Sequence, residues 1–333
     1  MSIFISIASY QDPLLVATLF SAYNNAEHKK DLIFGVCDQS DSGIKAEDLP
    51  FAKQIHYEHI DPSASKGPCW ARHRIQGSFN DEDYYLQIDS HTQFLERWDT
   101  QLIGALTDIE SHSSNDSYFS KPIITSYPRS FEVNDFSKGL FDLNVGDTNT
   151  QVMVYKEDEL FCRSSFSRQI GRPTELDRNT HAYLMAGGCI FTKGAFVRDI
   201  PYDPNYYFYG EEQSMALRAF TRGYSFFHIP DVPLFHLYTD VTNLPRKLHW
   251  DPEDDKNRVV KWTEREKKSL DRLDALFAGE LDQEWGLGSD RSLDDYAKIS
   301  GMDLKNKCIL DMDQATTPKF FQSTDWKVNP LKI

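Results

Sequence analysis

One short stretch of the chain, Asp89-Ser90-His91, combines residue types that can bind a divalent metal ion. The largely apolar residues 84–88 before it are typical of a buried strand, and residues i and i+2 of a strand project on the same face. Asp89 and His91 are therefore expected to point into one space at the end of that strand. A carboxylate oxygen together with an imidazole nitrogen suits Mn²⁺, whereas Mg²⁺ prefers oxygen ligands alone. The alternative interpretation is a strand that ends in a polar turn.

Two further acidic residues directly follow predicted strands. Asp12 comes after the apolar run 3–8, and Asp38 comes after the run 32–36. Asp12 also precedes a proline and a helical spacing of apolar residues, so it is a candidate N-cap of the next helix. If the strands are parallel, Asp12, Asp38 and Asp89 lie at the same edge of the sheet, which is where α/β folds bind ligands.

The alternation of strands and helices predicts the sheet that positions these residues. Short apolar runs predict the strands, and apolar residues at helical spacing predict the helices between them. The expected strands are 3–8, 32–36, 55–60, 84–89 and 122–127, and the expected helices include 14–22, 68–79 and 98–109. This order predicts an α/β fold with a mostly parallel central sheet.

Beyond residue 127 the periodicity is weaker. Residues 128–150 are predicted to form a long loop, after which 152–155 is expected to return to the sheet. The paired glycines Gly187 and Gly188 permit a close approach of the backbone to a ligand or to another strand. The other expected elements are a helix opening at 210–212, strands 224–229 and 232–236, a capping box at 263–266 and a helix that begins at Ser292.

The composition narrows the class of protein. The chain has 333 residues, with 36 Lys and Arg against 51 Asp and Glu, so its net charge is −15. A nonspecific nucleic-acid binder or a binder of anionic membranes needs a basic face, which this balance does not favour. No apolar run reaches the roughly 18–20 residues that span a bilayer. The five dispersed cysteines fit a reducing compartment. We therefore expect a cytoplasmic protein with no membrane span and no nucleic-acid partner.

The motifs, taken in order, resemble those of retaining GT-A glycosyltransferases. The greatest resemblance is to glycosyltransferase family 60, which adds N-acetylglucosamine to hydroxyproline of a cytoplasmic protein and is related to the polypeptide N-acetylgalactosaminyltransferases. The matching stretches are ISIASYQDP, GPCWARHRI, YYLQIDSH, LMAGGCIFTKGAF, YFYGEEQSMALRAFTRGY, PDVPLFHLY and GLGSDRSLDDYAKISGMDL. Because these stretches extend over nearly the whole chain, the resemblance implies a GT-A (Rossmann-like) fold with a helical C-terminal extension.

The resemblance also implies a set of ligand-binding residues. Asp89, His91 and His236 match the metal ligands, for Mn²⁺ or, alternatively, Mg²⁺. The donor, a UDP-sugar, is expected to contact the end of the first strand, an arginine of the helix 68–79, the metal triplet, the glycine pair and a later segment. The donor-binding residues implied in this way are Ser9, Tyr10, Asp12, Asp38, Arg72, Asp89, Ser90, Gly187, Gly188 and Arg246. Arg246 belongs to the segment 237–250, which by analogy closes over UDP.

The acidic pair Glu211 and Glu212 matches the catalytic helix start of the resembled enzymes. A carboxylate at a helix N-terminus is stabilised by the helix dipole and could bind sugar hydroxyls or orient the acceptor. Either residue is a candidate, and the other would then be an ordinary N-terminal acid. The related retaining enzymes are thought to use front-face attack, in which the leaving phosphate accepts the proton of the acceptor.

The expected function is metal-dependent, retaining transfer of N-acetylglucosamine from UDP-GlcNAc to a hydroxyl acceptor, with hydroxyproline of a cytoplasmic protein as a candidate. One alternative is a GT-A transferase that moves another UDP-sugar to a polysaccharide or other glycan. A second is an inactive nucleotide-sugar-binding protein. The expected organisation is a catalytic domain at 1–240, with a donor half to about residue 100 and an acceptor half from 101, followed by a lid segment and a helical extension at 241–333.

Overall fold

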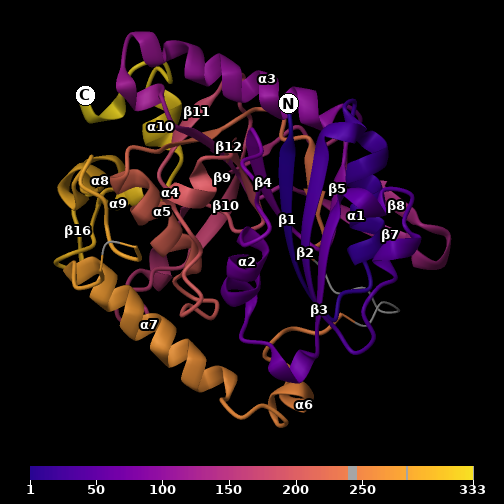
Figure 1. Cartoon of the computed structure of the whole chain (residues 1–333). Helices are drawn as coiled ribbons and strands as arrows, with labels where there is room; N and C mark the ends of the chain where they lie inside the picture. Colours follow the sequence, from indigo (N-terminus) through magenta and orange to yellow (C-terminus); the bar gives the residue numbers. More distant parts are fainter. Residues whose placement is uncertain (239–245, 283, 333) are drawn as a thin grey trace.

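The computed structural model describes residues 1–238, 246–282 and 284–332. Its largest element is a central eight-stranded sheet (Figure 1) in the order β11-β13-β6-β12-β4-β1-β2-β3. In that order the strands are Thr180–Ala182, Ser225–His228, Pro122–Thr125, Cys189–Lys193, Tyr84–Asp89, Ile3–Tyr10, Leu32–Gln39 and Ile55–Ile60. The four N-terminal strands are parallel to one another, whereas β12 is antiparallel to both β4 and β6. The predicted α/β fold is confirmed, with a parallel half and a mixed half.

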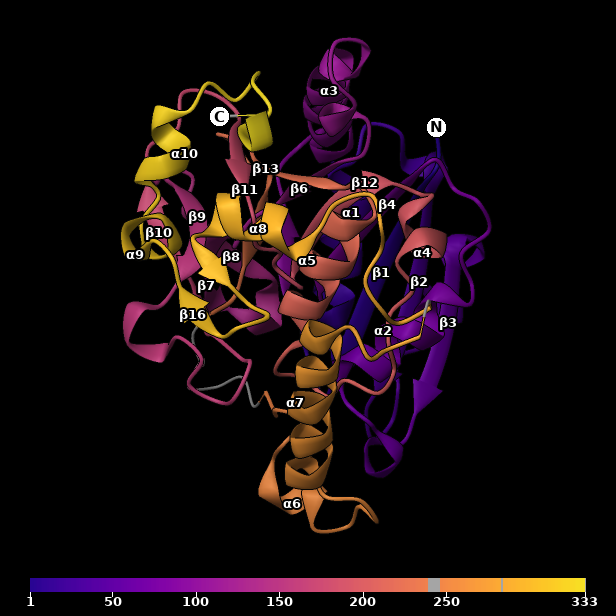
Figure 2. The same cartoon turned by 90° about the vertical axis from the view of Figure 1, so that its left-hand side faces the viewer.

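Helices cover both faces of this sheet (Figures 1 and 2). On one face, α1 (Leu15–Asn25) and α3 (Trp98–Glu110) share a core with Ile3, Ile5 and Ile7 of β1. On the other face, α2 (Pro68–Gln76) and α5 (Glu211–Thr221) share a core with Phe4 and Tyr85. Because both faces of β1 are buried, its sequence is a continuous apolar run rather than an alternating one. The remaining helices are α4 (Phe196–Asp199), α6 (Pro252–Asp255), α7 (Trp262–Ala278), α8 (Leu293–Ser300), α9 (Met312–Thr316) and α10 (Lys319–Ser323).

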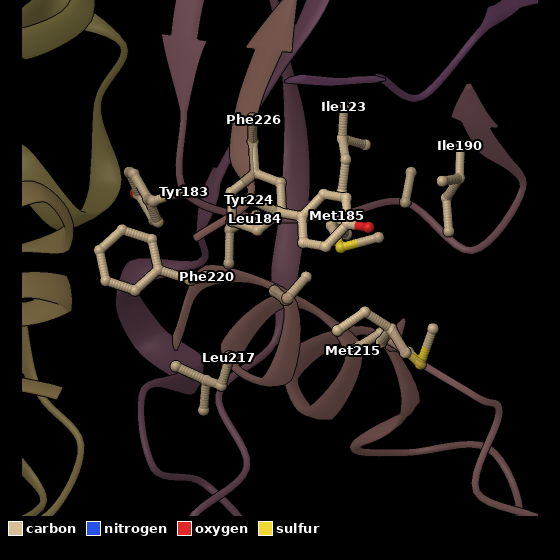
Figure 3. Packing of buried hydrophobic residues seen from close by; sticks show 14 of the residues in the cluster. Ile123, Tyr183, Leu184, Met185, Ile190, Met215, Leu217, Phe220, Tyr224 and Phe226 are labelled. Atoms are coloured by element: carbon tan, nitrogen blue, oxygen red, sulfur yellow. The ribbon is translucent and has the colours of Figure 1, made fainter. Parts of the chain in front are cut away.

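Helix α5 is held against the sheet by its apolar side chains. Figure 3 shows Met215 and Phe220 of this helix near Ile123 and Phe226 of the sheet, and all four are buried. Leu273 of α7 belongs to the same core, so α7 is anchored to α5. This packing fixes the N-terminal end of α5, where the acidic pair lies. The predicted boundary between the catalytic domain and a C-terminal extension stays a prediction.

The region 128–150 is not the long loop that the sequence predicted. It contains the antiparallel strands β7 (Arg129–Asp135) and β8 (Leu140–Leu143). They belong to a four-stranded sheet, in the order β5-β14-β7-β8, with β5 (Thr92–Phe94) and β14 (Leu234–His236). Phe131 and Val133 of β7 pack in a small hydrophobic core that is separate from the cores of the central sheet. The alternation of apolar and polar residues that would indicate a strand therefore includes only these two apolar positions.

Three other expectations were wrong in detail. The strand β9 (Thr150–Tyr155) was expected to join the central sheet, but it pairs with β10 (Gln169–Thr174) instead. A separate small pair is formed by β15 (Met302–Asp303) and β16 (Cys308–Ile309). The predicted capping box at 263–266 is not formed, since α7 has Lys261 at its N-cap and Glu266 is buried. Asp12 is not the N-cap of α1; that position is Leu14. The helix begun by Ser292 does have a capping box, with Asp295.

Candidate active site

A cavity of about 600 Å³ lies where β1 and β4 end. Every residue that the sequence analysis placed in the site lines this cavity, except Asp38. Asp38 is 2 % exposed, and its carboxylate accepts a hydrogen bond from Tyr57 Oη at 2.8 Å. The neighbouring Gln39 lines the cavity instead. The parallel pairing of β1 with β2 and β4 is what brings the predicted residues to one edge.

Asp89, His91 and His236 form a cluster suited to a metal ion. Each presents one ligand atom, and the three atoms lie within 4.8 Å of one another. Asp89 ends β4, and His236 reaches the same point as the last residue of β14, which pairs with β5 just after His91. His236 Nε2 is 3.1 Å from Asp89 Oδ2, and its other nitrogen, Nδ1, is buried without a hydrogen-bond partner in the described structure. One carboxylate oxygen and two imidazole nitrogens are a ligand set that fits a divalent metal ion.

The protonation states within this cluster also favour a cation. Burial tends to raise the pKa of Asp89, but the hydrogen bond from His236 and the charge of Arg72 hold that pKa well below its usual range. Burial and the neighbouring His91 lower the pKa of His236. Asp89 is therefore a carboxylate and His236 is neutral at neutral pH, which are the forms that bind metals.

Asp12 supports His91 from behind the cluster. Its Oδ2 lies 2.6 Å from His91 Nδ1 and also accepts a hydrogen bond from Ser90 Oγ at 2.9 Å. This carboxylate is only 3 % exposed, and its pKa is lowered because the bonds with His91 outweigh burial. A carboxylate that holds one ring nitrogen orients the other toward the ligand. The sequence predicted a donor contact for Asp12, whereas the structure places its carboxylate on the histidine.

Arg72 joins the metal cluster to the acidic pair. Its Nη2 donates to Asp89 Oδ1 at 2.8 Å, and its Nη1 forms an ion pair with Glu211. Tyr202 Oη donates to the same carboxylate at 2.7 Å and accepts from Gln87 Nε2 at 2.7 Å. A buried guanidinium between two carboxylates has a fixed position and a fully retained charge. The sequence analysis missed Gln87 and Tyr202, because a buried tyrosine or glutamine in an apolar stretch gives no distinct signal.

The glycine pair is required by these neighbours. A Cβ at Gly187 would lie 2.8 Å from Arg72 Nη1, and a Cβ at Gly188 would lie 2.7 Å from Asp89 Oδ2. Both distances are shorter than real Cβ contacts, so any side chain would displace the arginine or the carboxylate. The sequence predicted that these glycines allow the backbone to approach a ligand or another strand. In the structure, the groups that the backbone approaches at these glycines are the side chains of Arg72 and Asp89.

Glu212 differs from Glu211 in its surroundings. Its Oε1 accepts a hydrogen bond from the backbone N–H of Gly187 at 2.7 Å, and its Oε2 is 3.4 Å from Tyr127 Oη. Burial raises the pKa of Glu212 to about 8. At neutral pH this carboxyl group is therefore mostly protonated and can donate a hydrogen bond into the cavity.

The other end of the cavity is formed by Tyr10 and the segment after residue 245. Tyr10 Oη donates to Asp254 at 2.7 Å and accepts from Arg258 Nη2 at 2.6 Å. His249 packs against Tyr10, and burial together with the charge of Arg258 lowers the pKa of His249 to about 3. The sequence analysis did not identify Asp254 or Arg258, since neither belongs to a recognisable pattern.

Arg246 lines the cavity and donates to Leu237 O at 3.2 Å. Residues 239–245 of the predicted lid, with the expected turn at 243–245, lie outside the described part of the chain. Among the described residues, no helix is both long and apolar enough to cross a bilayer.

A solved glycosyltransferase structure shares the fold. GalNAc-T7 with UDP, GalNAc and Mn²⁺ superimposes with a TM-score of 0.52 at 13 % identity, covering 81 % of this chain and 54 % of that chain. The chain thus spans about half the length of that protein. Residues 1–349 of TarS from S. aureus, in complex with UDP-GlcNAc, give a TM-score of 0.47 at 12 % identity, covering 84 % of this chain and 73 % of that chain. No curated protein matches the chain by sequence. The expected GT-A fold is confirmed.

A family model for Glycosyltransferase (GlcNAc) matches residues 42–306. The matched range includes the metal cluster, Arg72, the glycine pair and the acidic pair, while Ser9, Tyr10, Asp12 and Asp38 precede it. Since the match covers most of the chain, the protein belongs to the Glycosyltransferase (GlcNAc) family.

Proposed function

We propose that the protein transfers N-acetylglucosamine from UDP-GlcNAc to a hydroxyl acceptor, with Mn²⁺ bound by Asp89, His91 and His236. The observation that carries this proposal is the convergence of the Asp-His-His cluster with Arg72 and the acidic pair in one cavity. The cavity, about 600 Å³, has the size of a small-molecule site.

The residues of the cavity divide the work of donor binding. Ser9 and Tyr10, at the end of β1, are proposed to contact the uridine, and Arg246 the diphosphate. Ser90 and the glycine pair are proposed to lie along the donor between them. In this proposal Asp12 acts by orienting His91. Asp38 does not contact the donor directly, because its neighbour Gln39 lines the cavity in its place. When bound, the metal would stabilise negative charge on the leaving diphosphate as a Lewis acid.

The acidic pair is proposed to position the sugar and the acceptor. Glu211, fixed by its ion pair with Arg72 and its hydrogen bond from Tyr202, accepts hydrogen bonds from sugar hydroxyls, and the protonated Glu212 can donate one. We propose retention by front-face attack: the acceptor oxygen bonds to the anomeric carbon as its bond to the phosphate oxygen breaks, and that phosphate takes the acceptor's proton. This stereochemistry follows the resemblance to retaining enzymes.

For the acceptor, we propose a hydroxyl of a cytoplasmic protein, with hydroxyproline as the first candidate from the resemblance to family 60. The two alternatives are a transferase that moves a different UDP-sugar to a glycan and a protein that binds the donor without turnover. The donor panel described next distinguishes them, because it measures both nucleotide release and donor binding.

The experiment is a donor panel. The purified chain is incubated with UDP-GlcNAc, UDP-GalNAc, UDP-glucose or GDP-mannose, with Mn²⁺, Mg²⁺ or a chelator, and nucleotide release is measured. We expect slow hydrolysis of UDP-GlcNAc with Mn²⁺, less with Mg²⁺ and none with the chelator. Release of nucleotide from another sugar alone would reassign the donor. No release, and no shift of the unfolding midpoint by any donor, would contradict the proposal. Once an acceptor is found, product NMR reports the anomeric configuration.

A further inference from the structure

A second cavity, of about 680 Å³, lies against a different face of α2 from the candidate active site. Pro68 and Arg72 of this helix line the active site, whereas Trp70, His73 and Arg74 line the second cavity. The opposite wall is α7, which contributes Arg265, Lys268 and Arg272 to the same cavity. We call this second cavity the basic groove.

The basic groove is positively charged in an acidic protein. Five of its lining residues are Lys or Arg and none is acidic: Lys66, Arg74, Arg265, Lys268 and Arg272. Arg265, Lys268 and Arg272 are spaced by three and four residues, so they lie on one face of α7. The chain as a whole carries a net charge of −15, so the charge of the groove has the opposite sign to the net charge of the protein.

Some of these cations are already neutralised, and others are not. Arg74 pairs with Glu58, Lys268 with Glu264, and Arg272 with Asp203. Lys66 and Arg265 have no carboxylate within ion-pair distance among the described residues, and Arg265 Nε is buried without a hydrogen-bond partner there. Five cations against three paired carboxylates leave an excess of about two positive charges, enough to attract an anion but not a dense polyanion.

An aromatic side chain organises the cations. The Lys66 ammonium lies 5.5 Å from the ring centroid of Trp70, and the Arg74 guanidinium lies 5.1 Å from it. Cation–π contacts of this kind hold long side chains in place and so reduce the entropy lost when a ligand binds. The floor between α2 and α7 is the loop Pro204–Tyr207, which is fixed by the hydrogen bond from Tyr207 N to Ser269 Oγ at 2.9 Å.

We propose that the basic groove binds a short acidic segment of a partner polypeptide. Guanidinium groups recognise carboxylates through paired hydrogen bonds, and the indole ring offers a face for the aliphatic parts of such a segment. A long polyanion such as RNA fits less well, because it would run onto the acid-rich surroundings. These include Glu264 at the start of α7, which pairs with the groove-lining Lys268. The inference does not depend on the reaction proposed above, because it concerns binding alone.

The test measures binding of a fluorescein-labelled peptide of alternating Glu and Asp by fluorescence anisotropy, with the Gln and Asn counterpart as the neutral probe. We expect binding of the acidic probe that weakens with added salt and no binding of the neutral probe. The double variant Lys66→Gln, Arg265→Gln should bind the acidic probe about tenfold more weakly, since two charge-assisted contacts are lost.

The control is Lys267→Gln, which removes one positive charge from α7, whereas the double variant removes two positive charges. Lys267 is 75 % exposed, pairs with Asp271 and does not line the groove. This variant should bind the acidic probe like the unmodified protein, and the unfolding midpoints of all variants check that they fold. Equal loss in the control, no loss in the double variant, or no binding of the acidic probe would overturn the proposal. Tighter, groove-dependent binding of a short single-stranded RNA would overturn the choice of a polypeptide. Each of these outcomes leaves the donor reaction untouched.

Discussion

The carboxyl group of Glu212 is poised to change its charge near neutral pH, because burial raises its pKa from the ordinary value of 4.5 to about 8. A group with a raised pKa in the folded state stabilises the fold while it is protonated. Its contribution is fully present below pH 4.5 and is lost as the pH rises through 8. The folded protein must then hold a partly buried carboxylate beside Glu211.

Replacing Glu212 by Gln removes this titration. Relative to the variant, the unmodified protein should lose on the order of 2–4 kcal/mol of unfolding free energy between about pH 5 and pH 9. Urea unfolding across that range measures the difference. Glu266→Gln is the control, since burial raises the pKa of Glu266 to about 7, and its effect should appear at a lower pH. A difference between Glu212→Gln and the unmodified protein that does not change with pH would contradict this account.

At the scale of elements, the turn before β12 is shaped by the groups it approaches. Gly187 and Gly188 let the backbone pass close to Arg72 and Asp89, whose positions are set by α2 and β4. The requirement is steric, because a Cβ at Gly188 would lie 2.7 Å from a carboxylate oxygen.

The variant Gly188→Ala should therefore shift Asp89 and weaken Mn²⁺ binding by about tenfold or more. Calorimetric titration with Mn²⁺ measures the affinity. The matched control is Gly104→Ala in α3, where a Cβ would meet nothing within 4 Å. That control should bind Mn²⁺ normally and gain about 0.5–1 kcal/mol of stability, because alanine is the better helix former. Unchanged Mn²⁺ affinity in Gly188→Ala would show that the turn does not restrain the metal cluster.

Elements with long or repeated signals could be predicted from the sequence. The buried strands β1, β2 and β4 and the helices α3 and α5 have apolar patterns that extend over many residues. The hairpin of β7 and β8 could not be predicted, because its buried positions are few and its outer face is polar. The start of α7 was mistaken because Glu266 fits a capping box by pattern, yet it is buried beside Tyr209 in the fold.

At the scale of the whole molecule, the central sheet and the small four-stranded sheet together build the site. β4 supplies Asp89 and β14 supplies His236, which are 147 residues apart in the chain. The sequence predicted that Asp12 and Asp89 lie at the same edge of the sheet, because parallel strands end at the same edge. His236, in contrast, was identified only through the family resemblance. The pairing of Asp12 with His91 depends on side-chain directions across two strands, which no pattern in the sequence specifies.

The central claim is that Asp89, His91 and His236 bind a divalent metal ion for a nucleotide-sugar donor. Electron paramagnetic resonance of free Mn²⁺, titrated with the protein and UDP, tests it most directly. Asp89→Asn should weaken Mn²⁺ binding by about 100-fold or more. The control Asp99→Asn alters another Asp–His pair, between the buried Asp99 and the half-exposed His28, and should lower stability but bind Mn²⁺ normally. Equal Mn²⁺ affinity in Asp89→Asn and the unmodified protein would contradict the claim.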